Sequence, residues 1–194
     1  MAKKTNYVVW FNEIDHDAVT LESLPDFDTP WKLNSGESLV GEFPKNPKCV
    51  ATAGVKKPVV PDSVANIDSV AIVSARMKAF FEEHDVSAVE YFPVAITLKG
   101  KPVDGSYFLM HHTSYIDCID VKKSARTVGE NKRITRLKSY VIDEAKIGAK
   151  RTVFRPLHFS DYPLVHRTLA DAMTEEGFTG IRWTELADLP ELLT

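Results

Sequence analysis

The chain lacks most of the features that mark secreted, membrane or metal-dependent proteins. Only two of its 194 residues are cysteines, Cys49 and Cys118, and their separation fits no metal-binding spacing. One disulfide between them stays open, but so few cysteines indicate a reducing compartment, and we expect a cytoplasmic protein. No stretch approaches the roughly 18 apolar residues of a membrane span. The opening MAKKTNYVVWFNEIDH has too short an apolar run for a secretory signal.

Catalytic motifs are absent too: there is no glycine-rich phosphate loop, no G-x-S-x-G and no H-E-x-x-H. The densest polar cluster is His111, His112, Asp117, Cys118 and Asp120. If this segment is a strand, His112, Cys118 and Asp120 share one face, on which they could gather around zinc. An extended strand would spread them over about 20 Å, which is too far for one ion. We therefore expect no metal and no cofactor.

A catalytic cysteine is the next alternative, with a histidine activating Cys118. Asp117 and Asp120 would raise the pKa of this thiol and so suppress the reactive thiolate. The apolar neighbours Ile116 and Ile119 indicate burial instead. We interpret Cys118 as structural.

A third group of candidate catalytic residues lies around Pro163, where we predict that the second of two helices begins. His158, Asp161 and His166 could form an imidazole–carboxylate pair for acid–base work. The simpler interpretation is that Asp161 or Ser160 caps the helix and the histidines lie on the surface. No catalytic residue is predicted, and we do not expect an enzyme.

The chain does contain one pattern twice. Residues 73–91 align without a gap to residues 165–183, and both have apolar residues at i, i+4, i+7 and i+8 followed by alternating ones. This order is typical of a helix, a tight turn and a strand. Ser74 is a candidate N-cap of the first helix, and Gly177 and its counterpart Asp85 are expected to be left-handed residues at the helix ends. The aligned apolar pairs are Val73/Val165, Met77/Leu169, Phe80/Ala172, Phe81/Met173, Val86/Phe178, Val89/Ile181 and Tyr91/Trp183.

The remaining segments favour strands. Residues 12–66 contain nine prolines and glycines, which favours short strands and long turns. Residues 107–121 are rich in β-branched and aromatic side chains and predict a long strand or a hairpin. The expected fold is α+β, mixed and strand-rich, with the two helix–turn–strand units packed on sheet. The length suits a single domain, 1–194, with two sublobes of about 1–100 and 105–194 as an open alternative.

Charge is segregated along the chain, although the net charge is only −3. Residues 121–155 hold eleven lysines and arginines against three acids, whereas residues 11–30 hold acids alone. Such segregation can steer a charged partner, or the runs can neutralise one another across the folded surface. The acids of the first run are Glu13, Asp15, Asp17, Glu22, Asp26 and Asp28.

The basic run raises the alternative of a nucleic-acid site. Lys132, Arg133, Arg136 and Lys138 lie close together in sequence, and Tyr140 could stack on a base. The net charge is negative, however, and no nucleic-acid-binding signature is present. We expect no nucleic-acid partner.

Four stretches resemble a family of bacterial immunity proteins found beside polymorphic toxins and type VI secretion effectors, typified by a myxobacterial immunity protein. The resemblance extends over most of residues 31–186 and departs from the family pattern at His111, His112 and His166. The stretches are Trp31 to Leu39; Ile72 to Lys78 with Val89 to Val94; Tyr107 to Met110 with Ile116 to Asp120 and Ser124; and Val153 to Arg155 with Gly177 to Trp183.

The resemblance implies a non-catalytic protein that binds a cognate toxin and blocks it in the producing cell or its kin. The acidic run from Glu13 to Asp28 would suit a basic nuclease toxin, and the basic run from Lys122 to Arg155 would suit an acidic toxin face. We prefer the acidic run as the toxin-binding surface. A non-catalytic ligand-binding or regulatory protein is the alternative function. The sequence gives no indication of the oligomeric state.

Overall fold

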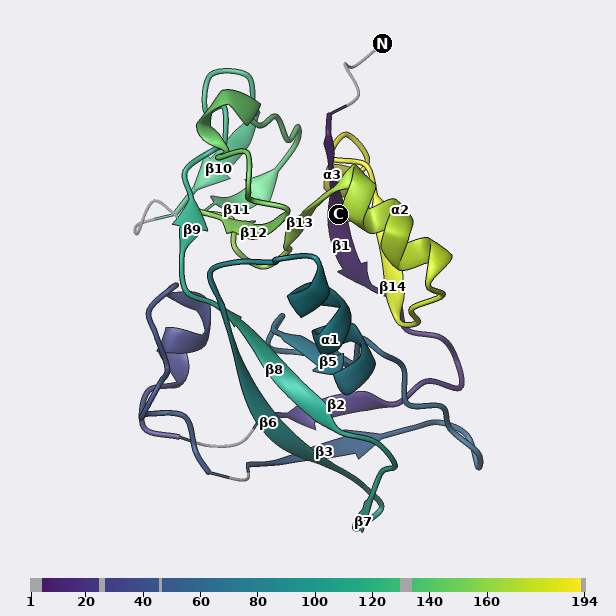
Figure 1. The fold of residues 1–194 in the computed structure, drawn as a ribbon. Coiled ribbons are helices and arrows are strands. Elements are labelled where there is room, and N and C mark those ends of the chain that lie inside the picture. Colours follow the sequence, from purple (N-terminus) through teal and green to yellow (C-terminus); the bar gives the residue numbers. More distant parts are fainter. Residues whose placement is uncertain (1–4, 25–26, 46, 130–133, 193–194) are drawn as a thin grey trace.

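The computed structural model describes residues 5–24, 27–45, 47–129 and 134–192 (Figure 1). The helices are η1 (Pro30–Asn34), α1 (Ala75–Glu83), η2 (Glu144–Lys146), α2 (Arg167–Glu175) and α3 (Leu189–Leu192). The strands are β1 (Tyr7–Asn12), β2 (Thr20–Ser23), β3 (Lys48–Thr52), β4 (Ala65–Asn66), β5 (Ala71–Ser74), β6 (Val89–Leu98), β7 (Lys101–Pro102), β8 (Tyr107–His112), β9 (Tyr115–Ile116), β10 (Arg126–Val128), β11 (Ile134–Leu137), β12 (Val153–Pro156), β13 (Leu164–His166) and β14 (Ile181–Thr184).

These strands form two large sheets. The five-stranded sheet has the order β14-β1-β13-β12-β9. The seven-stranded sheet has the order β4-β2-β3-β6-β8-β5, with β7 paired to β6, and β10 and β11 form a separate hairpin. The predicted class, α+β with more strand than helix, is confirmed.

The repeated pattern becomes the same unit in each sheet. β5, α1 and β6 form one unit and β13, α2 and β14 the other, so the repeat begins with a strand before the helix. A further strand lies between the two strands of each unit and runs antiparallel to both: β8 in the first and β1 in the second. The strand registers agree as well. Tyr91 of β6 pairs with Met110 of β8, and its aligned counterpart Trp183 of β14 pairs with Trp10 of β1. The inserted strand follows its unit in one half and precedes it in the other.

The two helices end in the same turn. Asp85 and Gly177 both have a positive φ, 51° and 68°, at equivalent positions after the helix. Three residues later Ala88 and Gly180 also have a positive φ, 58° and 78°. This left-handed geometry reverses the chain so that the next strand returns along the sheet. The predicted helix ends are therefore confirmed.

A single core joins the two units. All of the aligned apolar pairs belong to one cluster, which also contains Trp10, Met110 and Val153. The Phe80 and Phe178 rings, one from each unit, meet edge to face with centroids 5.1 Å apart. The Arg76 guanidinium lies 4.2 Å from the Phe178 ring centroid and donates to the Glu176 carbonyl oxygen at 2.9 Å. The repeat therefore produces two faces that pack on each other.

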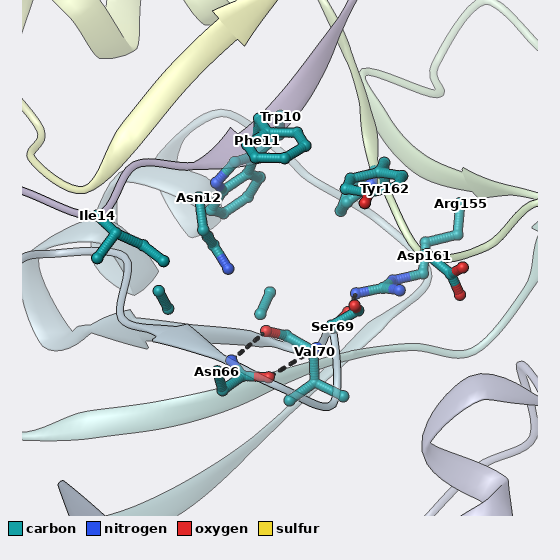
Figure 2. A pocket seen from close by; sticks show the side chains of 13 residues that line it. Trp10, Phe11, Asn12, Ile14, Asn66, Ser69, Val70, Arg155, Asp161 and Tyr162 are labelled. Atoms are coloured by element: carbon teal, nitrogen blue, oxygen red, sulfur yellow. Dashed lines mark hydrogen bonds between the residues drawn. The ribbon is translucent and has the colours of Figure 1, made fainter. Parts of the chain in front are cut away.

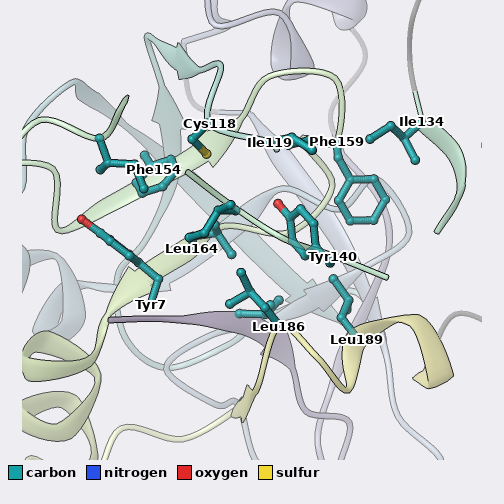
Figure 3. Packing of buried hydrophobic residues seen from close by; sticks show 13 residues of the cluster. Tyr7, Cys118, Ile119, Ile134, Tyr140, Phe154, Phe159, Leu164, Leu186 and Leu189 are labelled. Carbon is teal, nitrogen blue, oxygen red and sulfur yellow. The ribbon is translucent and has the colours of Figure 1, made fainter. Parts of the chain in front are cut away.

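Two further clusters bury the other side of each sheet. In β1, Val8 and Trp10 belong to the shared core, while Tyr7 and Val9 belong to a cluster with Cys118 and the C-terminal segment (Figure 3). The larger sheet has its own second cluster, which includes Cys49. Burial on both faces explains the uninterrupted apolar run of β1.

Two local predictions are wrong. Residues 107–121 are not one strand or a hairpin, because β8 ends at His112, β9 covers only two residues and Ile119 bridges to Ile142. The second helix begins at Arg167 and not near Pro163, since β13 intervenes. The amide of Trp10 donates to the Pro163 carbonyl oxygen at 2.9 Å, so pairing with β1 keeps this segment extended. In both places tertiary pairing overrides the structure that the local sequence favours.

Candidate functional site

A cavity of about 160 Å³ opens between the two sheets (Figure 2). Its walls are the end of β1 and the loop after it, the turn between β4 and β5, and the segment that follows β12. These three segments are far apart in sequence and meet only because β1 lies beside β13. The lining residues are Trp10, Phe11, Asn12, Ile14, Ala65, Asn66, Ser69, Val70, Ala71, Arg155, Asp161, Tyr162 and Pro163.

Stacked rings build one wall of the cavity. Phe11 and Tyr162 stack with ring centroids 5.1 Å apart and an interplanar angle of 9°. The Arg182 guanidinium lies 4.7 Å from the Phe11 ring centroid. These contacts fix the position of Phe11 at the edge of the sheet.

Arg155 is the most unusual polar residue of the cavity. Its side chain extends from β12 and is only 3% exposed. The guanidinium donates to the carbonyl oxygens of Ser69, at 2.6 Å, and Ser160. Burial lowers the pKa of Arg155, and attraction to Tyr115 and Asp161 opposes that shift. A guanidinium stays charged under all ordinary conditions, so the protein holds a buried positive charge here.

Trp10 and Asn12 bring further hydrogen-bond donors to the same space. Trp10 is 3% exposed, and its indole Nε1 has no hydrogen-bond partner in the described part of the chain. The Asn12 Oδ1 accepts a hydrogen bond from the Ser63 hydroxyl at 2.9 Å. This bond directs the amide nitrogen of Asn12 into the cavity (Figure 2).

The structure separates the acids of the predicted toxin-binding run. Glu13 and Asp15 are exposed, and Asp17 is partly exposed, on the loop between β1 and β2. Glu22 is exposed on β2, and Asp28 is exposed in the segment between β2 and η1. Asp26 lies outside the described residues. The described acids of the run are therefore spread over the loop before β2, β2 itself and the segment after it.

The loop that holds Glu13, Asp15 and Asp17 also borders the cavity. Its apolar residue Ile14 is 66% exposed and lines the cavity mouth. Within the described residues, the only ion pair of this loop joins Asp17 to its neighbour His16, at 4.0 Å. Nearby, Ile67 in the turn between β4 and β5 is 79% exposed. The loop after β1 thus presents both acidic side chains and an apolar one to solvent.

The basic run is more strongly tied into the fold. Lys123 pairs with Asp120 at 3.0 Å, and Arg126 donates to the carbonyl oxygens of Val121 and Ser124. Arg155 is buried, as described above. Several lysines of the run remain exposed, namely Lys122, Lys138, Lys146 and Lys150.

The aromatic residue that the nucleic-acid alternative requires is buried. Tyr140 is buried in the cluster around Cys118, so it cannot stack on a base (Figure 3). Lys132 and Arg133 lie outside the described residues, and of Arg136 only the backbone, in β11, is described.

The candidate catalytic residues do not form a common site. Burial raises the pKa of the Cys118 thiol to about 12 and that of the Cys49 thiol to about 11. The two thiols are free and lie in different clusters. The His111 Nε2 donates to the Glu37 carbonyl oxygen at 2.6 Å, and His112 is fully buried beside Arg155. No group of three potential metal ligands occurs among the residues that the structure describes.

The third candidate group has other roles. His166 itself is the N-cap residue of α2, without a side-chain cap bond, and its Nδ1 lies 2.8 Å from the Thr168 hydroxyl. The prediction that Asp161 or Ser160 caps the helix is therefore wrong, because β13 displaces the helix start. Asp161 instead lines the cavity. No helix in the described ranges is long and apolar enough to cross a membrane.

The sequence alone did not identify Trp10, Asn12 or Arg155 as a group. Trp10 lies in an apolar run that reads as core, Asn12 follows that run, and Arg155 is about 140 positions away in a basic run. Strand periodicity places Trp10 and Asn12 on one face, but it does not link them to Arg155, whose position beside them depends on the pairing of β1 with β13. The only local sign was an arginine between two buried apolar residues of a strand.

Comparison with known families identifies the chain. No curated protein sequence matches it. The model of the immunity protein family Imm11 matches residues 8–188, which include both repeated units and every wall of the cavity. The family resemblance inferred from the sequence motifs is thereby confirmed. The chain belongs to the Imm11 immunity protein family.

Proposed function

We propose that this protein neutralises a cognate bacterial toxin by binding it directly, without catalysis. The family match, which covers nearly the whole chain, is the observation that carries the proposal. The buried, weakly acidic thiols and the scattered histidines supply no catalytic group that argues against it. In this proposal the toxin is a polymorphic toxin or a type VI secretion effector, and it is met in the cytoplasm of the producing cell or its kin.

The acidic loop is the surface that we assign to the toxin. Glu13, Asp15 and Asp17 have no lysine or arginine partner within the described residues, so their field extends into solvent. The exposed side chain of Ile14 between them can be buried by a partner. A basic toxin face would match both features. Glu22 and Asp28 are proposed to add to the same field, and so is Asp26, which lies outside the described residues.

Co-expression tests the proposal. Cells that express the toxin encoded next to this gene should survive only when this protein is present. The purified pair should elute as one complex in gel filtration. Survival of cells without complex formation would rule out direct neutralisation.

Charge reversal tests the surface. The triple variant Glu13→Lys, Asp15→Lys, Asp17→Lys should slow association with the toxin by about tenfold or more at low salt, and should flatten its salt dependence. The matched control is Glu83→Lys, Asp104→Lys, Asp171→Lys, which changes the net charge equally at exposed positions elsewhere. Stopped-flow measurements at several ionic strengths give the rates. Equal rates for the two triple variants would remove the acidic loop from the interface.

A further inference from the structure

We propose that the cavity between the two sheets binds a carboxylate group carried on a small apolar body. The cavity would bind an anion, whereas the acidic loop would bind a basic protein surface. Ile14, at the cavity mouth, belongs to both. The proposal does not depend on toxin neutralisation, and either can fail without the other.

Several hydrogen-bond donors line this space, and not all of their N–H groups are used by the described residues. The Trp10 indole N–H is buried and has no partner in the described residues. The Asn12 amide has its oxygen engaged by Ser63 and presents its N–H groups to the cavity (Figure 2). Arg155 has five N–H groups, and the described residues engage two of them. A buried donor without an acceptor destabilises the fold, so a ligand rich in acceptors would recover free energy by binding here.

The charge at the site favours an anionic acceptor. Two charged residues line the cavity, Arg155 and Asp161. Figure 2 places the Asp161 carboxylate on the side of the guanidinium that faces away from Trp10 and Asn12. The space between Trp10, Asn12 and Arg155 is therefore lined by donors and by one cation. A planar carboxylate can accept two N–H bonds of a guanidinium in parallel, which a neutral carbonyl cannot do.

The size and the remaining walls define the rest of the ligand. A cavity of about 160 Å³ holds a molecule of roughly the size of a substituted phenyl ring. Phe11, Tyr162, Val70 and Ile14 supply aromatic and aliphatic surface for its body. Arg155, Trp10 and Asn12 then bind the carboxylate end of the ligand, and the apolar walls bind its body. Two sources share this chemistry: a free carboxylic acid, and the C-terminal residue of a polypeptide.

Titration with phenylacetate tests the site in the intact protein. Indole ¹H–¹⁵N NMR resolves the side-chain N–H groups of Trp10, Trp31 and Trp183, which single Trp→Phe variants assign. The Trp10 signal should shift saturably with phenylacetate. The Trp183 signal should not, because its N–H already donates to the Thr174 hydroxyl at 3.0 Å. Phenylacetamide, which has the same shape without the charge, should bind at least about tenfold more weakly.

The variant Asn12→Asp provides the matched change. Aspartate keeps the oxygen that accepts from Ser63 but replaces the donating amide with a negative charge. It should weaken phenylacetate binding about tenfold or more while the amide spectrum stays that of a folded protein. Trp183→Phe, which leaves the cavity unchanged, should bind like the wild type. Absence of a saturable Trp10 shift, equal binding of the amide, or wild-type binding by a folded Asn12→Asp protein would overturn the proposal.

A second titration distinguishes the two sources. Acetyl-Ala-Phe with a free carboxylate is compared with phenylacetate by the same Trp10 signal. Tighter binding of the peptide assigns the site to a polypeptide C-terminus, and tighter binding of phenylacetate assigns it to a free acid. Binding of the peptide's C-terminal amide as tightly as its free acid would contradict the carboxylate requirement itself.

Discussion

Gly180 shows how one residue fixes the position of the two sheets. It adopts φ of 78°, and its counterpart Ala88 shows that a side chain can be accommodated at this φ in the other unit. At Gly180, however, a Cβ atom would overlap the Ser63 carbonyl oxygen and lie 2.8 Å from the Pro61 Cβ. A glycine is therefore needed here mainly because residues 61–63 pack directly against its Cα. The turn itself needs it less.

Replacing Gly180 should separate these two effects. Gly180→Ala should lower the free energy of unfolding by about 3 kcal/mol or more, because the backbone must move as well as bear the left-handed strain. Gly177→Ala is the matched control, since Gly177 has φ of 68° and nothing within 4 Å of a Cβ. It should cost only about 1 kcal/mol. Urea denaturation gives both values, and equal losses would contradict the overlap.

His112 gives the protein a predictable acid sensitivity. Burial, with smaller contributions from the charges of Arg155, His111 and Arg151, lowers the pKa of His112 well below its usual 6.5. Below pH 6.5 the unfolded chain binds a proton that the folded chain does not bind. Stability is thus lost as the pH falls.

The variant His112→Asn tests this linkage. Between pH 6 and pH 5 its free energy of unfolding should fall less steeply than that of the wild type, by about 1.4 kcal/mol per pH unit. Asparagine is chosen because Asn12 occupies the equivalent place in β1. Identical slopes for the variant and the wild type would show that folding does not lower the pKa of His112.

At the scale of elements, the two helices begin differently although their surroundings match. The Ser74 hydroxyl caps α1 by accepting from the Met77 amide at 3.2 Å, and it donates to Asp62 at 2.7 Å. Asp62 also accepts from Arg76 and from the Thr179 amide, and these hydrogen bonds hold its pKa below the ordinary value despite the opposing effect of burial. The start of α1 is thereby tied to the turn after α2. At the equivalent cap of α2, His166 makes no such bond.

Ser74→Ala should therefore destabilise the protein more than His166→Ala, the equivalent change at α2. It removes a cap bond and one partner of Asp62, and we expect a loss of about 1–2 kcal/mol. His166→Ala removes no cap bond and should cost less. Thermal unfolding of the two variants provides the comparison, and a larger loss for His166→Ala would refute the asymmetry.

For the whole molecule, the shared core decides how the chain unfolds. Phe81 of the first unit is fully buried, and its ring centroid lies 5.8 Å from that of Trp10, which belongs to the second unit's sheet. Similar contacts join Phe80 to Phe178. Because neither unit can bury its apolar face alone, we expect the two to unfold together.

Phe81→Ala tests this cooperativity. The cavity that it creates should lower the free energy of unfolding by about 3–5 kcal/mol. Tryptophan fluorescence and far-UV circular dichroism should still report one urea transition. Trp31→Ala, at a position 66% exposed, should cost about 0.5 kcal/mol or less. Two resolved transitions in either variant would mean that the halves are independent.

Local signals predicted the parts of this protein that depend on neighbours in sequence. The helix–turn–strand units, the Ser74 cap and the left-handed residues Asp85 and Gly177 all follow from periodicity and side-chain chemistry within a few residues. The exposure of Glu13 and Asp15 also follows from local composition. These features require no knowledge of what packs against them.

The tertiary structure decided the rest. Whether residues 164–166 are strand or helix, and where the strand after Tyr107 stops, depends on pairing with segments about 150 and 20 residues away. The meeting of Trp10, Asn12 and Arg155 has the same origin. The amino-acid sequence by itself determined which faces are apolar and where each unit turns. Only the folded chain determined which faces meet. Strand pairing and burial are non-local, so the local sequence of a segment does not specify the segment that it packs against.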